Sequence, residues 1–494
     1  MSRVFAPIHI DEVLPSQNKS SIAIATETLA RLAADDNYAV LEVNPDALVY
    51  ASQSENRYRA GTPLSRFDGL PLLIKDNIDT GDRMQTTAGS AALLSTRAGG
   101  DAFLVKKLRA AGIHPIGKAN MSEWANFRAM ASSSGYSTRG GQCLNPYNPL
   151  RCPSGSSSGS AAAVAAGLVP VALGSETDGS IISPSARCGV VGIKPTVGLV
   201  SRTGVIPICA SQDTVGTHAN SVADATAVLA IIAGTDPRDP ATHAIPKGLI
   251  DALTSAPTLP IQGLRIGYVT QDYSGYDERI DTRMRAVVEM LRGAGATVIT
   301  DVVIPHVQAV RTNDAEFVVM LYEFKEQLNA YLRTRVPLVG MEASAVQSLA
   351  DVIAYNERNP NPGFAFDQGI LERAQAMSDA DTQRYLRARQ WLRQHAAVEG
   401  IDAALQTHQL DAIIVPSGTP AWLIDQMNGD PRSPSDSTTM AACAGYPLIT
   451  VPIGMLDGLP IGVTIMGTAW SDAMLVRVAA GIEHCIAKEQ ADAR

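Results

Sequence analysis

The sequence predicts an α/β fold in a single domain. Helical and strand patterns alternate along its 494 residues, and no internal repeat, low-complexity tract or linker divides them. The hydrophobic share is 46% and the charged share 18%, so the chain can bury a sizeable core and is neither disordered nor collagen-like. One domain spanning residues 1–494 is therefore expected.

The first elements alternate between helix and strand. Helices are expected at residues 20–35 and 101–112, and strands within residues 68–77 and 114–117. The second helix begins with Asp101 as its N-cap. The first strand follows a turn signal and ends on Lys75. A lysine in this position is normally a surface charge, so its role depends on what lies beside it.

Two loops of small residues flank a short helix and strand. Residues 132–159 are rich in Ser and Gly and run directly into an Ala-rich helix at 160–166 and a strand at 169–173. The second loop covers residues 174–180. A flexible linker would not continue directly into buried elements, whereas a helix N-terminus offers unpaired N–H groups and positive potential. These loops are therefore candidates for a functional site.

The rest of the chain continues the alternation. Helices are expected near residues 280–294 and around 308–356 and 380–407, and strands at 296–303 and 410–415. Residues 448–452 and 461–466 form a hairpin-like pair of strands around Asp457 and Gly458. Nothing separates these elements from the first half of the chain.

Composition and patterning disfavour several classes of function. A net charge of −9 without a basic stripe argues against nucleic-acid binding. No basic residues precede an apolar run at the N-terminus and no run of eighteen apolar residues occurs, so a soluble, cytoplasmic protein is expected without membrane contact. The cysteines lack metal-ligand spacing and are expected to be buried free thiols, with no metal implied: Cys143, Cys152, Cys188, Cys209, Cys443 and Cys485.

The Ser-rich loop allows several chemistries, which its details distinguish. It lacks the lysine of a phosphate-binding P-loop. Residues 155–159 match the GxSxG elbow with Ser157 as nucleophile, but the segment before them is turn-rich where the elbow needs a strand. The downstream histidines lie in segments without a catalytic signature: His218, His243, His306, His395, His408 and His484. A triad that contains histidine is therefore disfavoured.

Ser180 is the candidate nucleophile of the second loop. The segment that ends at Ser180 could direct consecutive backbone N–H groups to one point, as an oxyanion hole requires, and Gly179 permits the close approach. Lysine can act as the base when it is neutral, but its ordinary pKa of about 10.4 must fall toward neutrality through burial or nearby positive potential. Lys75 is the plausible base.

These motifs together resemble the amidase-signature family. The chain is similar to its lysine motif at residues 69–79 (GLPLLIKDNID), to its GSSGGSA loop at 155–161 (GSSSGSA) and to its TDTGGSI loop at 175–181 (SETDGSI), and the match continues at 188–196 (CGVVGIKPT). The resemblance runs from about residue 20 to 485. It implies a large mixed twisted β-sheet covered by helices on both faces, with a helical segment at about 1–60, a catalytic core at about 61–235 and a remainder that completes the sheet and the substrate pocket.

The resemblance also implies the roles of individual residues. Lys75 matches the general base of the family, Ser156 its bridging serine and Ser180 its nucleophile, and a cis peptide is implied between Gly155 and Ser156. Histidine and cofactors take no part. The expected oxyanion donors are the backbone N–H groups of Thr177, Asp178, Gly179 and Ser180.

The closest likeness within the family is to bacterial peptide amidases, carried by residues 122–128 (SEWANFR), 139–142 (RGGQ), 175–180 (SETDGS) and 467–473 (GTAWSDA). It implies a small-molecule or peptide amide as substrate, in a monomer or homodimer. The alternatives are a glutaminase-type A subunit of a tRNA-dependent amidotransferase, a fatty-acid or aryl amide hydrolase, and an inactive binding scaffold. The candidate pocket residues are Trp124, Phe127, Ser132, Ile182 and Trp422.

Two departures from the family pattern concern the second loop. Ile182 stands where many members have an arginine, which disfavours a small, negatively charged substrate. Glu176 and Asp178 bring carboxylates next to the expected oxyanion hole. They either recognise substrate or tie down the loop, and we expect the second role.

Overall fold

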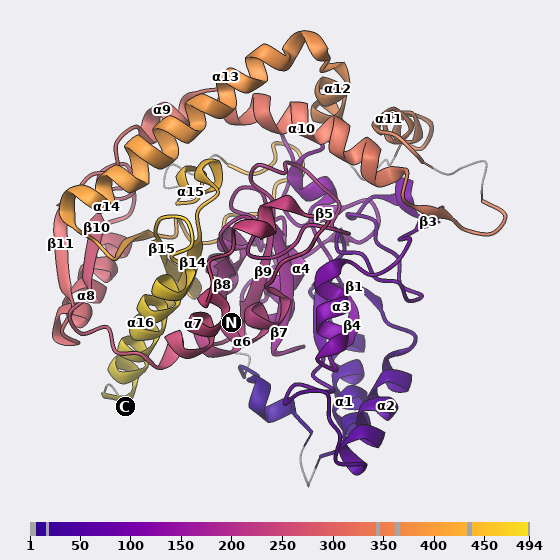
Figure 1. The fold of residues 1–494 in the computed structure, drawn as a ribbon, viewed down its shortest axis with the longest axis horizontal. Helices are drawn as coiled ribbons and strands as arrows, with labels where there is room; N and C mark the ends of the chain where they lie inside the picture. Colours follow the sequence, from indigo (N-terminus) through magenta and orange to yellow (C-terminus); the bar gives the residue numbers. More distant parts are fainter. Residues whose placement is uncertain (1–5, 16–18, 342–345, 361–365, 432–436, 493–494) are drawn as a thin grey trace.

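The computed structural model describes residues 6–15, 19–341, 346–360, 366–431 and 437–492. A mixed sheet of eleven strands forms its centre (Figure 1). In spatial order the strands are β1 (Val40–Val43), β4 (Pro115–Ala119), β2 (Leu72–Lys75), β7 (Val171–Glu176), β9 (Thr214–Ala219), β8 (Val191–Lys194), β14 (Leu448–Leu456), β15 (Leu459–Met466), β13 (Ala412–Pro416), β10 (Arg265–Val269) and β11 (Thr297–Val302).

Strand direction changes along this sheet. The β4–β2–β7 and β13–β10–β11 neighbours are parallel, and the pairs between β7 and β13 and at the β1 edge are antiparallel. Two small sheets lie outside it: β3 (Thr96–Arg97) with β12 (Val336–Pro337), and β5 (Tyr136–Ser137) with β6 (Gly141–Gln142). The predicted α/β fold with a large mixed sheet is confirmed.

Alternate side chains of β2 separate the two faces of the sheet. Leu72 and Ile74 belong to one hydrophobic core, whereas Leu73 packs into another with residues of α4 (Ser158–Ala165). Since successive residues of a strand point to opposite faces, Lys75 lies on the same face as Leu73 and α4. The first face is covered by α3 (Phe103–Ala110), α6 (Val222–Ile232), α8 (Glu278–Gly293) and α16 (Asp472–Asp492).

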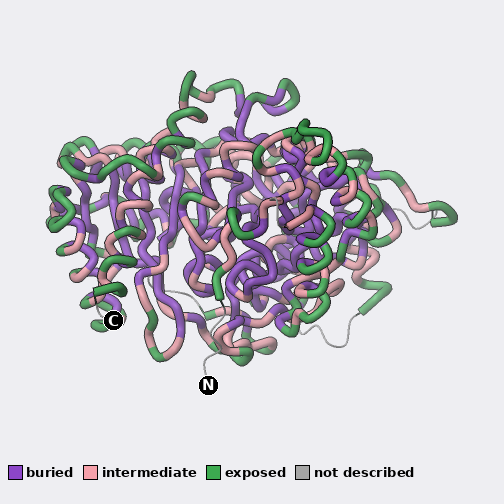
Figure 2. The backbone as a smooth tube through the Cα atoms, turned by 90° about the horizontal axis from the view of Figure 1, so that it is seen from below, coloured by how far each residue is buried: buried purple, intermediate pink, exposed green. Residues whose placement is uncertain are grey.

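The second face carries α4 and α5 (Ile182–Cys188), beneath an arch of helices along the top of Figure 1. The arch includes α9 (Val307–Thr312), α10 (Ala315–Leu332), α13 (Thr382–Leu392), the π-helical η8 (Arg393–Asp402) and α14 (Ala403–His408). The remaining α-helices are α1 (Ser21–Ala33), α2 (Ala47–Arg59), α7 (Leu249–Ser255), α11 (Leu349–Arg358), α12 (Gly369–Ala376) and α15 (Thr439–Ala444). Buried backbone runs through the middle of the molecule (Figure 2).

Most of the predicted elements are confirmed within a few residues, including the strand that ends on Lys75 and the hairpin turn. Asp457 and Gly458 both have positive φ, as a two-residue hairpin turn requires. Two expectations about where elements begin and end are wrong. Asp101 is not the N-cap of α3, because its carboxylate accepts hydrogen bonds from the Gly81 amide and the Arg109 guanidinium. The loop expected from residue 174 begins at Thr177, because β7 keeps its pairing with β9 through Glu176.

The N-terminal segment adds a strand that the pattern did not indicate. Residues 1–60 were expected to be helical, yet β1 lies between α1 and α2 and forms one edge of the main sheet. Of the expected buried thiols, four are buried and Cys443 and Cys485 are partly exposed; all six are free. Among the described residues, no helix is both long and apolar enough to cross a bilayer.

Candidate active site

Lys75 is fully buried at the end of β2, and three oxygen atoms surround its amine. Nζ lies 2.8 Å from Ser156 Oγ, 2.9 Å from the Ser175 carbonyl oxygen and 2.9 Å from Ser175 Oγ. Ser175 reaches this position because β7 runs parallel to β2, with Leu73 opposite Ala172. The strand pairing therefore holds the amine in one place.

The environment of Lys75 favours its neutral form. Burial lowers the pKa of the amine to about 7, although the Glu176 and Asp213 carboxylates act to raise it. Desolvation penalises the charged form of a buried lysine, which is the larger effect here. A lysine with this pKa can accept a proton near neutral pH.

Ser156 lies in the segment that leads into α4, and its peptide bond with Gly155 is cis, as the resemblance implied. The Ser156 carbonyl accepts a hydrogen bond from the Ser122 amide at 3.1 Å. The next residue, Ser157, is tied to β7, since its Oγ lies 3.0 Å from the Ser175 carbonyl oxygen and 3.2 Å from the Ser175 amide nitrogen. Both sides of Ser156 are thus fixed to other elements.

Ser180 lies beside this segment, just before α5. The Ser157 amide donates to the Ser180 carbonyl at 3.1 Å, which brings the two Ser-containing loops together. The Ser180 residue is 5% exposed. Among the described residues, its hydroxyl has no hydrogen-bond partner, so the structure contains the Lys75–Ser156 contact but no Ser156–Ser180 hydrogen bond.

The carboxylates of Glu176, at the end of β7, and of Asp178, in the loop that follows, both bind protein groups. One oxygen of Glu176 accepts from the amides of Ile181 at 2.6 Å and Ile182 at 2.9 Å. Asp178 accepts from the Thr438 hydroxyl at 2.6 Å and the Thr439 hydroxyl at 2.7 Å. These bonds tie the loop to the start of α5 and to α15, as the expected structural role requires.

Backbone conformation in the loop suits an oxyanion site. Gly179 has φ of 75°, and a Cβ there would approach the Thr438 hydroxyl oxygen to 3.1 Å. In the described part of the chain, the amides of Thr177 and Ser180 donate to no carbonyl or side chain. Two of the expected donors are therefore available to a substrate oxygen.

The structure supports neither His218 nor the elbow serine as an alternative. Burial lowers the pKa of His218 to about 3, and the charge of Lys75 contributes to a smaller extent. The His218 Nδ1 lies 2.8 Å from Ser185 Oγ. It is therefore neutral, and its described side-chain partner is a serine other than Ser156 or Ser180. No strand leads directly into Ser157, which the elbow geometry requires.

The candidate pocket residues fall into two groups. Trp124, Phe127 and Ile182 lie in one buried core, where both aromatic rings pack edge-on against Phe324. Ser132 and Trp422 meet at Asp430, which donates its amide to the Ser132 carbonyl at 3.0 Å and accepts from the Trp422 indole N–H at 2.9 Å. Their role in substrate binding stays a prediction.

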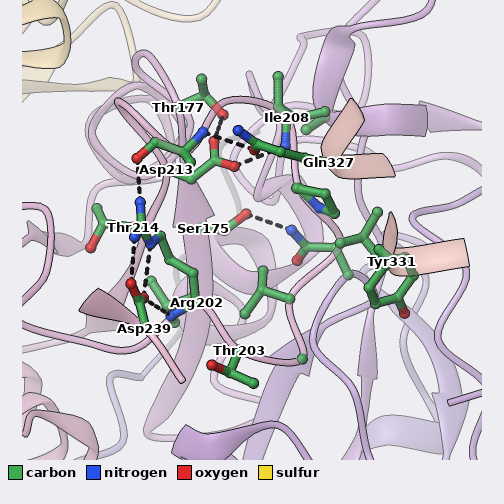
Figure 3. A pocket seen from close by; sticks show the side chains of 18 of the residues that line it. Ser175, Thr177, Arg202, Thr203, Ile208, Asp213, Thr214, Asp239, Gln327 and Tyr331 are labelled. Carbon is green, nitrogen blue, oxygen red and sulfur yellow. Dashed lines mark hydrogen bonds and ion pairs between the residues drawn. The ribbon is translucent and has the colours of Figure 1, made fainter. Parts of the chain in front are cut away.

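A cavity of about 430 Å³ adjoins the lysine site (Figure 3). Ser175 and Asn77 line it, together with the Arg202–Asp239 ion pair and Tyr331 of α10. The described lining includes none of the five candidate pocket residues. Neither Asn77 nor Ser175 was predicted to belong to the site, although both lie in the motifs that indicated it. Asn77 follows Lys75 by two residues, and Ser175 directly precedes Glu176.

Comparisons with known proteins place the sequence and the fold in one family. A family model described as Amidase matches residues 23–476. The solved peptide amidase from Stenotrophomonas maltophilia is 45% identical, with a TM-score of 0.87 and coverage of 94% of this chain and 93% of that one. A probable amidase from Arabidopsis thaliana is 39% identical, covering 90% of this chain and 83% of the relative. The A subunit of the glutamyl-tRNA(Gln) amidotransferase from Chloroflexus aurantiacus is 35% identical, covering 93% and 92% respectively.

Proposed function

The chain belongs to the amidase family, and from this premise we propose that it removes the C-terminal amide from peptides through an acyl-enzyme on Ser180. The contact between a buried, readily neutral Lys75 and Ser156 carries the chemical part of the proposal. The likeness to a solved peptide amidase supports the choice of substrate.

Bond formation at the substrate carbonyl begins with two proton transfers. Neutral Lys75 takes the proton of Ser156 Oγ, and Ser156 takes the proton of Ser180 Oγ. The Ser180 oxygen then forms a bond to the amide carbon. The available backbone N–H groups of Thr177 and Ser180 hold the oxygen of the tetrahedral intermediate, an interaction typically worth about 3–4 kcal/mol for each donor.

Collapse of the intermediate breaks the C–N bond. The Lys75 ammonium returns its proton to Ser156, which passes its own proton to the leaving nitrogen, so ammonia departs neutral. Water then attacks the acyl-enzyme by the same relay, yielding the peptide acid and free Ser180. Every proton taken up by Lys75 is returned within the cycle.

The proposal predicts a distinct order of substrates. We expect peptide C-terminal amides to exceed glutamine, long-chain acyl amides and aryl acetanilides in kcat/KM by at least about tenfold each, a difference of about 1.4 kcal/mol in transition-state binding. Ammonia or amine release from a matched panel measures this. The same peptide with a free C-terminal acid is the inert control. A preference for glutamine would instead support the amidotransferase alternative, which the 35% identity to a protein of that class favours.

The pH dependence of kcat/KM tests the state of Lys75. The base works only when deprotonated, so activity should rise about tenfold per pH unit below pH 7 and level off above it, because the lysine pKa is about 7. Initial rates from pH 5 to 9 on a peptide amide measure the curve. A rate that is already constant between pH 5 and 7 would contradict this state of Lys75.

A further inference from the structure

A chain of hydrogen bonds joins the relay lysine to the cavity in Figure 3. Asn77 is 3% exposed, and its Nδ2 donates to Ser175 Oγ at 2.9 Å. The same Ser175 oxygen lies 2.9 Å from Lys75 Nζ. Asn77 Oδ1 and Thr214 Oγ1 are buried in the cavity wall and have no protein partner among the described residues.

The hydrogen-bond count around neutral Lys75 sets a requirement on Ser175. A neutral amine has two N–H donors and one lone pair, whereas the ammonium has three donors. For Lys75 to act as base, its lone pair must face Ser156, so both N–H groups must donate elsewhere. Apart from Ser156 Oγ, the acceptors within hydrogen-bond distance in the described part of the chain are the Ser175 carbonyl and hydroxyl oxygens.

The Ser175 hydroxyl can also donate a hydrogen bond to the Lys75 amine instead of accepting one from it. If its own proton points to the Lys75 lone pair, the amine can no longer accept the proton of Ser156. With Asn77 Nδ2 donating to one lone pair of Ser175 Oγ and Lys75 to the other, the Ser175 proton is left to face the cavity. A water there can accept this proton and donate to Asn77 Oδ1, which otherwise stays buried without a partner.

We propose that Asn77 is a positioning residue, which acts with water in the cavity to direct the Ser175 hydroxyl away from Lys75 and so leave the lysine lone pair to Ser156. The proposal rests on the function proposed above, in which Lys75 is the base. Among the described residues, the buried Asn77 Oδ1 has no partner, which makes the cavity wall beside Ser175 suitable for an ordered water. Charged groups acting on Lys75 come from elsewhere: Glu176 at the end of β7 and Asp213 just before β9, while His218 on β9 is neutral.

Replacement of Asn77 by leucine tests the proposal. Asn77→Leu keeps the volume and removes both polar atoms. In this variant the Ser175 hydroxyl can donate a hydrogen bond to the Lys75 amine, which stabilises the neutral lysine. The acidic limb of the pH–rate profile should therefore move to lower pH by about one unit. We expect kcat to fall about 10- to 100-fold, since one positioned group is lost from proton transfer, with KM changed less than about twofold. Thr214→Val is the control: it removes an unpartnered hydroxyl from the same cavity and should leave kcat and KM within about twofold of wild type.

A second pair of variants keeps the test decisive if Asn77→Leu does not fold. Ser175→Ala removes the hydroxyl and should lower kcat, and Ser175→Thr should restore it to within about threefold, since it returns the hydroxyl. The proposal is overturned if Asn77→Leu matches Thr214→Val in kcat and pH profile, or if Ser175→Thr is no better than Ser175→Ala. If Lys75→Met retains activity, the proposed function itself fails; if Lys75→Met is inactive and Asn77→Leu is normal, only this inference fails.

Discussion

Replacement of Ser180 by alanine is expected to reduce kcat for a peptide amide by about 10⁴- to 10⁶-fold, since loss of a single member of a serine hydrolase triad costs a factor of this order. Without the Ser180 oxygen no acyl-enzyme can form, and the Lys75–Ser156 pair has no second serine to activate. Ammonia release under saturating substrate measures kcat. Residual activity would come from water attack at a carbonyl held by the loop amides.

The matched control is Ser160→Ala, one turn into α4. The Ser160 hydroxyl donates to the Leu173 carbonyl at 2.8 Å, and among the described residues it makes no hydrogen bond to Lys75 or Ser156. We expect Ser160→Ala to keep kcat within about threefold, because removing one hydrogen bond costs about 1 kcal/mol of stability and leaves the relay intact. A fluorophosphonate probe should label wild type and Ser160→Ala but not Ser180→Ala. Labelling of Ser180→Ala at the wild-type rate would disprove the assignment of the nucleophile.

Local patterns predicted the elements that carry the site. The residues of β2 that precede Lys75 are apolar because the strand is buried on both faces. The Ala-rich sequence of α4 fits a helix packed tightly against the sheet. Gly159 illustrates this packing, since a Cβ there would lie 2.2 Å from the Ala39 carbonyl oxygen. These features depend on neighbouring residues, so they can be deduced from the sequence.

Strand order and the missed elements depend on contacts between distant residues. β8 pairs with β14, more than two hundred residues later, and α16 covers β14 on the opposite face from α5. The short β8 contains a glycine and gives little periodic signal, so its place in the sheet depends on tertiary burial, which overrides weak local preferences. The apolar residues of α16 do recur at helical spacing, so this helix could have been predicted from the sequence, although the strand that it covers could not.

The candidate site shows the same division. The sequence indicated Lys75, Ser156 and Ser180 through their motifs, yet it could not show that Ser175 contacts the lysine with two oxygens, since this follows from the parallel register of β2 and β7. It predicted that Asp178 ties down its loop, but it could not identify the threonine partners, which lie about 260 residues away.

Replacement of Lys75 by methionine is expected to lower kcat for a peptide amide by at least about 10³-fold. The variant loses the general base of the relay and also the ammonium that returns a proton to the leaving nitrogen. The residual rate should no longer show the rise through pH 7 that reports the lysine pKa. Methionine has a similar length and suits a site without solvent, so the variant should remain folded. Circular dichroism and initial rates between pH 5 and 9 measure both effects.

Lys118 provides a matched control, because it is a second fully buried lysine on the neighbouring strand β4. Its amine contacts the Ile78 carbonyl and lies 2.9 Å from the Thr86 hydroxyl, away from the serines of the relay. Lys118→Met removes the same group from an equally buried position, so it should reduce stability while keeping the rise through pH 7 and most of the turnover per folded molecule. If both variants lose activity equally, the loss follows from removing any buried amine from the sheet and does not identify Lys75 as the base. If only Lys75→Met does, and its pH dependence disappears, Lys75 is the base that makes Ser180 reactive.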